Sequence, residues 1–260
     1  MAELNGAPVG IEQMKALALI NYGHFTSMLV RDRAVRGLSL HLDRLVRDCR
    51  ILFDVDLDRD RVRHFVGQAV ADAKEPVIAR VTVFDPDLQL GRPGANAEPH
   101  VLVAMRAAPG GSLPALRLQS VNHQRDLAAV KHVGLFSTLW HRRKAQRSGY
   151  DDVLFVDSAG RVCEGSTWNI GFCDGERILW PEADWLPGVT MTLLNQSHAG
   201  VVATEPVSLD RLPSLQAAFA TNASVGVRPI AAIDGHSWAT DHAAVPILCN
   251  EYNEVPPERL

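Results

Sequence analysis

Cysteine is scarce in this chain, and the few cysteines present are scattered. The four cysteines among 260 residues stand at positions 49, 163, 173 and 249 and include no C-x-x-C pair. Neither a zinc site nor a disulfide framework is therefore indicated, and free thiols are typical of a reducing compartment. The ten histidines show no spacing of metal ligands either, so we expect no metal.

The chain also lacks an excess of positive charge and a long apolar run. Its 26 basic and 30 acidic residues give a net charge of -4, which argues against nucleic acid or an anionic membrane as a partner. The N-terminus has no basic start followed by an apolar segment, and no run is long enough to span a membrane. We expect a cytoplasmic protein.

What the chain does have is the composition of an ordinary globular protein, with 47% hydrophobic and 22% charged residues. Glycine and proline cluster at 108–114, between two apolar runs. Such a cluster predicts an interdomain linker. We therefore expect an N-terminal domain over 1–107 and a larger C-terminal domain over 115–260.

Both helical and strand patterns occur, without a regular βαβ alternation. Apolar residues at steps of three and four from Leu38 to Leu52 predict a helix. Further helices are expected over 60–73 and 135–147 and after 188, and strands over 77–84, 100–105, 116–121 and 153–156. Asp174-Gly175 predicts a type I′ hairpin turn between arms at 168–172 and 177–180. This mixture is typical of the α+β class.

No general nucleotide-binding, hydrolase or metalloprotease motif is present. Polar groups in four other segments stand out instead: Lys131 before a predicted helix, Glu164 between a strand and a turn, Leu186–Thr190 at a helix start, and Asn222-Ala223 before a strand. Taken singly, each has an ordinary explanation, such as a solvated lysine or a carboxylate in a turn. Their combination is what carries information.

In their order and spacing, these segments resemble the class IV aminotransferase family, the fold-type IV pyridoxal phosphate enzymes. The resemblance extends over nearly the whole chain and includes Tyr22–Ser27, His41–Leu45 and Gly149–Leu154. It implies a two-domain α+β fold, with a smaller N-terminal α/β domain and a larger C-terminal domain around a β-barrel-like core. It also implies pyridoxal 5'-phosphate as cofactor, small-molecule amine and keto acid substrates, and a homodimer.

The resemblance assigns catalytic roles to two residues. Lys131 would hold the cofactor as an imine and then act as general base. Glu164 would keep a proton on the pyridine nitrogen, so that the ring can accept electrons. The phosphate would lie at the helix start, where backbone N–H groups favour a dianion. The expected cofactor-binding residues are Arg44, Lys131, Glu164, Leu186, Gly188, Val189, Thr190, Asn222 and Ala223.

The residues expected to bind the substrate do not match the pattern of any single subfamily. Phe136 stands where branched-chain aminotransferases have a tyrosine, and Phe25-Thr26-Ser27 resembles the deoxychorismate lyases. Arg80 resembles the branched-chain arginine that helps to hold the substrate carboxylate. The expected substrate residues are His24, Phe25, Thr26, Arg80 and Phe136.

We predict a transaminase that moves an amino group from a D-amino acid or (R)-amine to a keto acid such as pyruvate or 2-oxoglutarate. The alternatives are a 4-amino-4-deoxychorismate lyase and a branched-chain L-amino acid aminotransferase. A protein that only carries pyridoxal phosphate would bind the cofactor without reacting with amines. The presence of both Lys131 and Glu164 argues against such a carrier.

Overall fold

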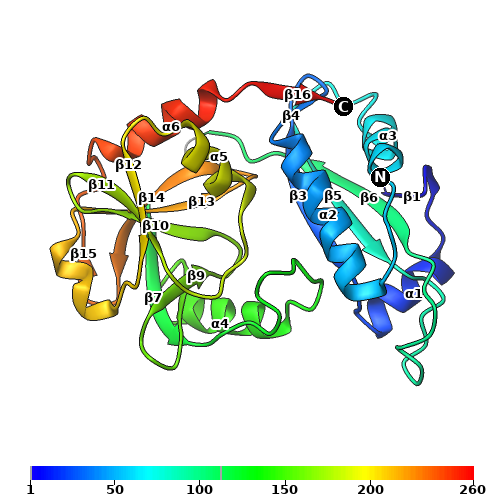
Figure 1. The fold of residues 1–260 in the computed structure, drawn as a ribbon, viewed down its shortest axis with the longest axis horizontal. Helices are drawn as coiled ribbons and strands as arrows, with labels where there is room; N and C mark the ends of the chain where they lie inside the picture. The colour runs from blue at the N-terminus through cyan, green and yellow to red at the C-terminus, as the bar shows by residue number, and fades with distance from the viewer. Residues whose placement is uncertain (1, 112) are drawn as a thin grey trace. The chain divides into compact units, whose positions relative to one another are not determined.

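The computed structural model describes residues 2–111 and 113–260, and the chain divides into two compact units (Figure 1). Unit 1 comprises residues 1–109, 130–134 and 256–260, and unit 2 comprises 110–129 and 135–255. The predicted linker at 108–114 includes residue 112, which lies outside the described residues. Two short segments from the second half of the sequence thus belong to unit 1.

Unit 1 is built on a five-stranded antiparallel sheet in the order β2-β1-β6-β5-β3. Its strands are β1 (Ala2–Leu4), β2 (Ala7–Pro8), β3 (His24–Val30), β5 (Val77–Phe84) and β6 (His100–Ala107). Helices α2 (Leu38–Phe53) and α3 (Arg59–Ala69) share one apolar core with β3, β5 and β6. Helix α1 (Ile11–Leu19) packs against a second, smaller cluster around Phe84 and Leu102.

Backbone pairing explains why the two late segments belong to unit 1. Strand β16 (Pro257–Arg259) pairs with β4 (Ala34–Arg36). The segment 130–134 runs along β3, where Phe25 N donates to Lys131 O at 2.9 Å and Val133 N donates to Gly23 O at 2.9 Å. These bonds occupy the outer edge of β3, the last strand of the sheet.

Unit 2 is built on a nine-stranded mixed sheet with the path β12-β11-β10-β13-β14-β7-β8-β9, to which β15 adds at β14. Its strands are β7 (Leu116–Asn122), β8 (Asp152–Val156), β9 (Val162–Gly165), β10 (Asn169–Cys173), β11 (Arg177–Pro181), β12 (Val201–Glu205), β13 (Ala217–Asn222), β14 (Gly226–Ile233) and β15 (His236–Ser237). Val162 lies on β9, the last strand of this path, and Leu179 lies on β11, the second strand, yet both belong to the same buried cluster. The sheet must therefore curl around its own core.

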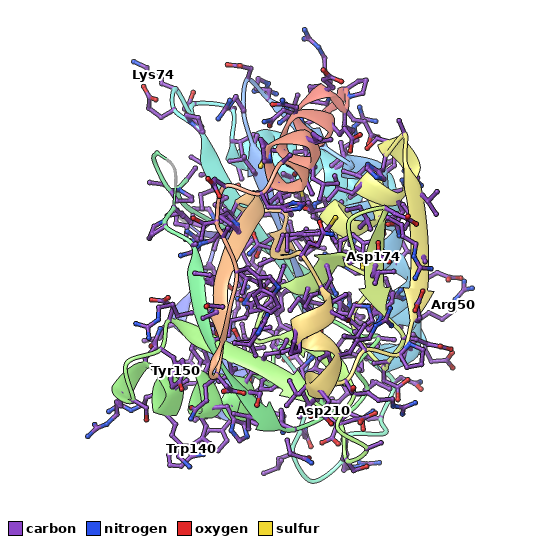
Figure 2. The ribbon with its side chains drawn as sticks, turned by 90° about the vertical axis from the view of Figure 1, so that its left-hand side faces the viewer. Arg50, Lys74, Trp140, Tyr150, Asp174 and Asp210 are labelled. Carbon is purple, nitrogen blue, oxygen red and sulfur yellow. The ribbon has the colours of Figure 1, made fainter. Side chains whose placement is uncertain are left out.

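Four helical segments belong to unit 2: α4 (Phe136–Arg147), α5 (Val189–Ser197), α6 (Ala244–Glu254) and the short 3-10 helix η1 (Leu209–Ser214). Helix α4 packs on β8 through Ala145 and Phe155. Its opposite side carries exposed apolar residues, among them Trp140, which projects outward in Figure 2 and is 57% exposed. Among the described residues, no helix combines the length and the apolar character that a membrane crossing requires.

The predicted elements are found with shifts of a few residues at most at their ends, but the predicted turn type is wrong. The strand expected over 77–84 has those bounds, whereas the helix expected to reach 73 ends at Ala69. A type I′ turn needs positive φ at both central residues. The predicted central residues are Asp174 and Gly175; Gly175 has a φ of +103°, but Asp174 is not among the residues with positive φ. The Asp174 carboxylate accepts the N–H groups of Glu176 and Arg177 instead and so shapes the turn.

Candidate active site

The backbone of Lys131 is held from two sides within unit 1. Its carbonyl oxygen accepts the N–H of Phe25, and its own N–H donates to Asp48 Oδ2 at 3.0 Å. Asp48 is completely buried on α2, and its other oxygen accepts Arg47 Nε at 2.9 Å. Lys131 Nζ lies 5.0 Å from the centre of the Phe25 ring. The main chain of the lysine is thus fixed, and its amine lies beside an aromatic face.

The predicted substrate residues of β3 lie on opposite faces of the sheet, because successive side chains of a strand alternate. Phe25 is on the same face as Arg80, whose guanidinium carbon lies 3.6 Å from the centre of the Phe25 ring. His24 and Thr26 point to the other face, where α2 packs. The structure thus brings Phe25, Arg80 and Lys131 together. Phe136 belongs to unit 2, where it begins α4 and is 80% exposed.

His24 and Thr26 form a buried polar cluster with two residues of α2. Arg44 Nη2 donates to Thr26 Oγ1 at 2.6 Å, and Thr26 Oγ1 lies 2.7 Å from His41 Nδ1. Burial lowers the pKa of Arg44 to about 10, so the guanidinium stays charged at neutral pH. Burial, with a further contribution from Arg44, lowers the pKa of His24 to about 3 and the pKa of His41 well below its usual range. The cluster thus contains one guanidinium and two neutral imidazoles, and the buried carboxylate of Asp48 on the same helix partly offsets the lowering of the Arg44 pKa.

Glu164 lies on β9 of unit 2, where two donors fix its carboxylate. Arg125 Nε donates to Glu164 Oε1 at 2.8 Å, and Leu186 N donates to Oε2 at 3.3 Å. Less than a tenth of either charged side chain is exposed. Arg125 is not predicted from the sequence, because its partner lies 39 residues away and no local pattern links the two.

The segment from Leu186 to Thr190 fits a phosphate group. Asn169 Nδ2 donates to Leu186 O at 2.8 Å, and a Cβ on Gly188 would lie 2.0 Å from Asn169 Oδ1. Gly188 is the N-cap of α5, with buried Val189 as the first helical residue. The hydroxyl of Thr190 is buried and has no hydrogen-bond partner among the residues that the structure describes. A buried hydroxyl without a partner costs about 1–3 kcal/mol. A ligand with acceptor oxygens at this helix N-terminus would satisfy it.

A second orphaned hydroxyl lies at the end of β13, the strand against which α5 packs. Thr221 is buried and its Oγ1 also lacks a partner. The turn that follows is shaped by Asn222 Oδ1, which accepts the N–H groups of Ser224 and Val225 at 3.0 Å each. The turn at Asn222-Ala223 thus adjoins a second buried hydroxyl that is left without a partner over 2–111 and 113–260.

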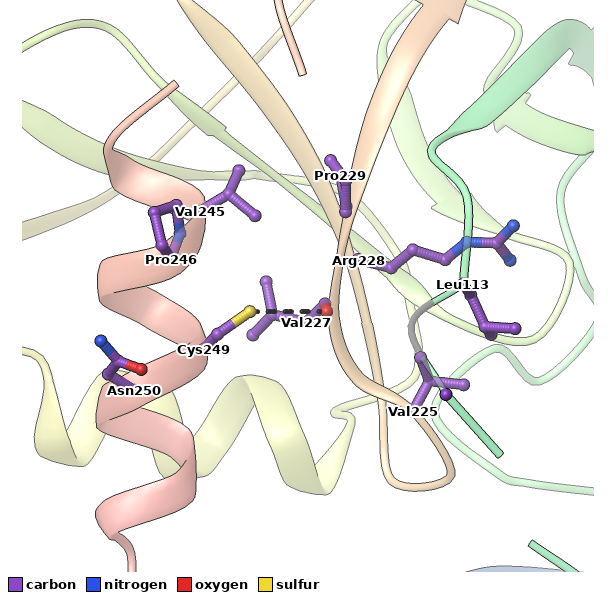
Figure 3. A pocket seen from close by; sticks show the side chains of 10 residues that line it. Leu113, Val225, Val227, Arg228, Pro229, Val245, Pro246, Cys249 and Asn250 are labelled. Atoms are coloured by element: carbon purple, nitrogen blue, oxygen red, sulfur yellow. Dashed lines mark hydrogen bonds between the residues drawn. The ribbon is translucent and has the colours of Figure 1, made fainter. Parts of the chain in front are cut away.

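Unit 2 contains two hollows, and one of them is lined by a residue that contacts Glu164. One, of about 720 Å³, is lined by 124–129 and 183–185 and contains Arg125 on its wall. The other, of about 420 Å³, lies between β14 and α6 (Figure 3). Its one thiol, Cys249, has a pKa raised by burial and contacts Val227 O at 3.7 Å. None of the predicted site residues lines this second hollow.

A family profile described as amino-transferase class IV matches residues 23–233, most of the chain. The chain belongs to the class IV aminotransferase family. The predicted family is therefore confirmed, and so is pyridoxal 5'-phosphate, which this family uses as its cofactor. The roles of the individual site residues stay predictions.

Among curated relatives, a probable branched-chain amino acid aminotransferase of Rickettsia bellii is 30% identical over 121 residues, 44% of this chain and 42% of the relative. The chain thus matches less than half of that relative's length. A hypothetical aminotransferase from Mycobacterium tuberculosis has a similar structure, with a TM-score of 0.83, 19% identity and 98% of each chain covered. A branched-chain aminotransferase from Thermoproteus uzoniensis gives a TM-score of 0.85 at 20% identity, covering 97% of this chain and 93% of the other. The predicted fold type IV is confirmed.

Proposed function

We propose that this chain is a pyridoxal-phosphate-dependent aminotransferase whose amine donor is an α-amino acid with an apolar side chain, in the first place a branched-chain L-amino acid. The observation that carries the proposal is the grouping of Lys131 and Arg80 against the ring of Phe25. An amine that can exchange with the donor's amine and a cation that can accept its carboxylate share one apolar surface. A donor with a carboxylate uses all three groups, whereas a simple amine leaves Arg80 unused.

Pyridoxal phosphate, when bound, supplies an aldehyde that reacts with amines and a ring that accepts electrons. Lys131 would hold the aldehyde and would act as general base. Glu164 would pair with the pyridine nitrogen, and Leu186 would lie beside the ring. The phosphate would be held by Arg44, by the start of α5 at Gly188–Thr190 and by the Asn222-Ala223 turn. The orphaned Thr190 hydroxyl and the charged Arg44 guanidinium support this assignment.

The curated relatives are named probable branched-chain amino acid aminotransferases, which supports an L-amino acid with an aliphatic side chain as donor. The D-amino acid or (R)-amine predicted from the sequence is the second candidate, since Phe136 replaces the tyrosine of the branched-chain pattern. The lyase is the third, because of Phe25-Thr26-Ser27. The predicted homodimer and cytoplasmic location stay predictions.

A panel of donors separates the candidates. L-Leucine, D-alanine and (R)-1-phenylethylamine are each offered with pyruvate and with 2-oxoglutarate, and pyruvate release from aminodeoxychorismate is followed without an acceptor. We expect L-leucine to be the best donor. A preference for D-alanine or the (R)-amine would favour the second candidate, and pyruvate release without any amine transfer would favour the lyase.

Arg80→Gln tests the carboxylate assignment within the same panel. We expect a KM for α-amino acids raised about tenfold or more, equivalent to at least about 1.4 kcal/mol, and little change for an amine that has no carboxylate. Arg106→Gln on the neighbouring strand is the matched control, because Arg106 is exposed. Equal losses for both kinds of donor would contradict the role of Arg80.

The lysine assignment is tested by reduction. Borohydride should attach the cofactor permanently to Lys131, as read by peptide mapping. Attachment to Lys15, Lys74 or Lys144 would overturn the proposed site.

A further inference from the structure

We propose that Arg125 is a positioning residue that sets the proton affinity of the cofactor's pyridine nitrogen by sharing the charge of Glu164. The inference rests on the proposed role of Glu164 and adds a residue to it. Arg125 itself is held in place, because its Nη2 donates to Ala128 O at 2.6 Å while its Nε donates to Glu164 Oε1. The guanidinium is therefore a fixed charge.

The geometry restricts how Glu164 can meet a ring. Oε1 is engaged by Arg125 and Oε2 by the N–H of Leu186, so the carboxylate cannot rotate without losing a contact. Both charged side chains are almost entirely buried. Both oxygens of the carboxylate are thus tied to groups of unit 2, and the position of Glu164 is fixed before any ring binds.

The charges fix the direction of the effect. In a buried site, a guanidinium at hydrogen-bond distance stabilises the carboxylate form of Glu164 and opposes a second positive charge nearby. A protonated pyridine nitrogen is such a second charge. The neighbouring thiol of Cys163 stays neutral and adds no negative charge, since burial and the acidic groups Asp157 and Glu164 raise its pKa to about 11. Arg125 thus makes the ring nitrogen less basic than Glu164 alone would make it.

Unit 2 offers a matched control in the ion pair of Arg142 and Asp152. Arg142 Nε donates to Asp152 Oδ1 at 3.0 Å, and Asp152 also accepts Ser166 Oγ at 2.8 Å and Trp168 Nε1 at 2.9 Å. This pair braces the turn that follows Glu164 but does not contact the Glu164 carboxylate in any bond described. Arg142→Gln therefore tests the loss of a partly buried ion pair without a change at Glu164.

The experiment follows ring protonation, not turnover. Holoenzyme is prepared with cofactor labelled with 15N at the pyridine nitrogen, and the 15N chemical shift is recorded against pH for the unaltered protein and for Arg125→Gln, Glu164→Gln and Arg142→Gln. We expect Arg125→Gln to raise the pKa of the ring nitrogen by about one unit or more, a tenfold gain in proton affinity. Arg142→Gln should leave the titration unchanged.

The remaining outcomes separate this inference from the proposed function. If Glu164→Gln lowers the ring pKa but Arg125→Gln changes nothing at any pH, the role of Arg125 is overturned and that of Glu164 stands. If neither substitution alters the titration, the assignment of Glu164 itself fails. Should Arg125→Gln not fold, Arg125→Met keeps the length of the apolar stem, and the same rise is expected of it.

Discussion

Thr190 and His24 are both buried with polar atoms that the protein itself does not satisfy. Their chemistry differs: the threonine offers a hydroxyl at the start of α5, whereas the histidine is a neutral imidazole between β3 and α2. We propose a ligand as the partner of the Thr190 hydroxyl, whereas we assign no ligand to His24. Single substitutions distinguish the two cases.

Thr190→Val should leave the unfolding free energy of the cofactor-free protein unchanged or slightly raised, because no protein hydrogen bond is lost. Retention of pyridoxal phosphate should weaken about tenfold, read as an increased Kd in a cofactor titration. Thr192→Val is the matched control on the same helix. Thr192 Oγ1 donates to Gly188 O at 3.0 Å, so that variant should lose about 1 kcal/mol of stability. The reverse pattern would show that the Thr190 hydroxyl has a structural partner.

His24→Leu should reduce the sensitivity of the fold to acid. The folded-state pKa of about 3 lies below the usual 6.5, so as the pH falls below 6.5 the unfolded chain takes up a proton that the folded chain does not. Stability attributable to His24 is therefore lost from pH 6.5 down to about 3 and is constant below. Denaturant unfolding of the cofactor-free protein at pH 7 and pH 5 should show a difference smaller by about 2 kcal/mol in the variant. The exposed His64→Leu serves as control, and an unchanged pH slope in His24→Leu would contradict the expectation.

At the scale of elements, the start of α5 depends on a glycine for steric reasons. The φ of Gly188 is -73°, which any residue can adopt, but an added Cβ would lie 2.0 Å from Asn169 Oδ1. Asn169 cannot yield without releasing Leu186 O, to which its amide donates. The glycine and the asparagine thus fix the α5 N-terminus together.

Gly188→Ala should therefore cost about 1–3 kcal/mol of stability and also weaken cofactor retention, since the N–H groups of α5 move. Gly235→Ala is the control, because a Cβ there meets nothing within 4 Å. Thermal unfolding with and without added cofactor separates the two effects. Unaltered stability and retention in Gly188→Ala would mean that Asn169 adjusts freely.

Elements with a one-sided apolar pattern could be predicted, and β3 shows why others could not. The α2 stripe from Leu38 to Phe53 and the β-branched run of β5 are local signals. Strand β3 was not predicted, because His24, Phe25 and Thr26 are all buried and no alternation of polar and apolar residues marks the strand. The ion pair of Arg125 and Glu164 left no signal for a similar reason, since only tertiary structure joins the two.

For the whole molecule, the class of fold and the family followed from the order of short motifs, and the division of the chain did not. The sequence analysis assigned Lys131 to the C-terminal domain, yet its segment 130–134 belongs to unit 1. Backbone pairing with β3 decides this, and almost any residue can make main-chain hydrogen bonds, whatever its side chain. Composition therefore cannot reveal it.

This pairing has a consequence for exchanging parts between relatives. The chain passes from one unit to the other four times, at about residues 109, 129, 134 and 255. A chimera that takes its first 109 residues from another class IV protein would combine a foreign β3 with the original strip 130–134, and so with the original Lys131. The backbone of Lys131 would then face a foreign strand and a foreign residue in place of Asp48, the two partners that fix it in this chain. Any graft of the first 109 residues must accordingly carry two further inserts of five residues each, 130–134 for β3 and 256–260 for β4.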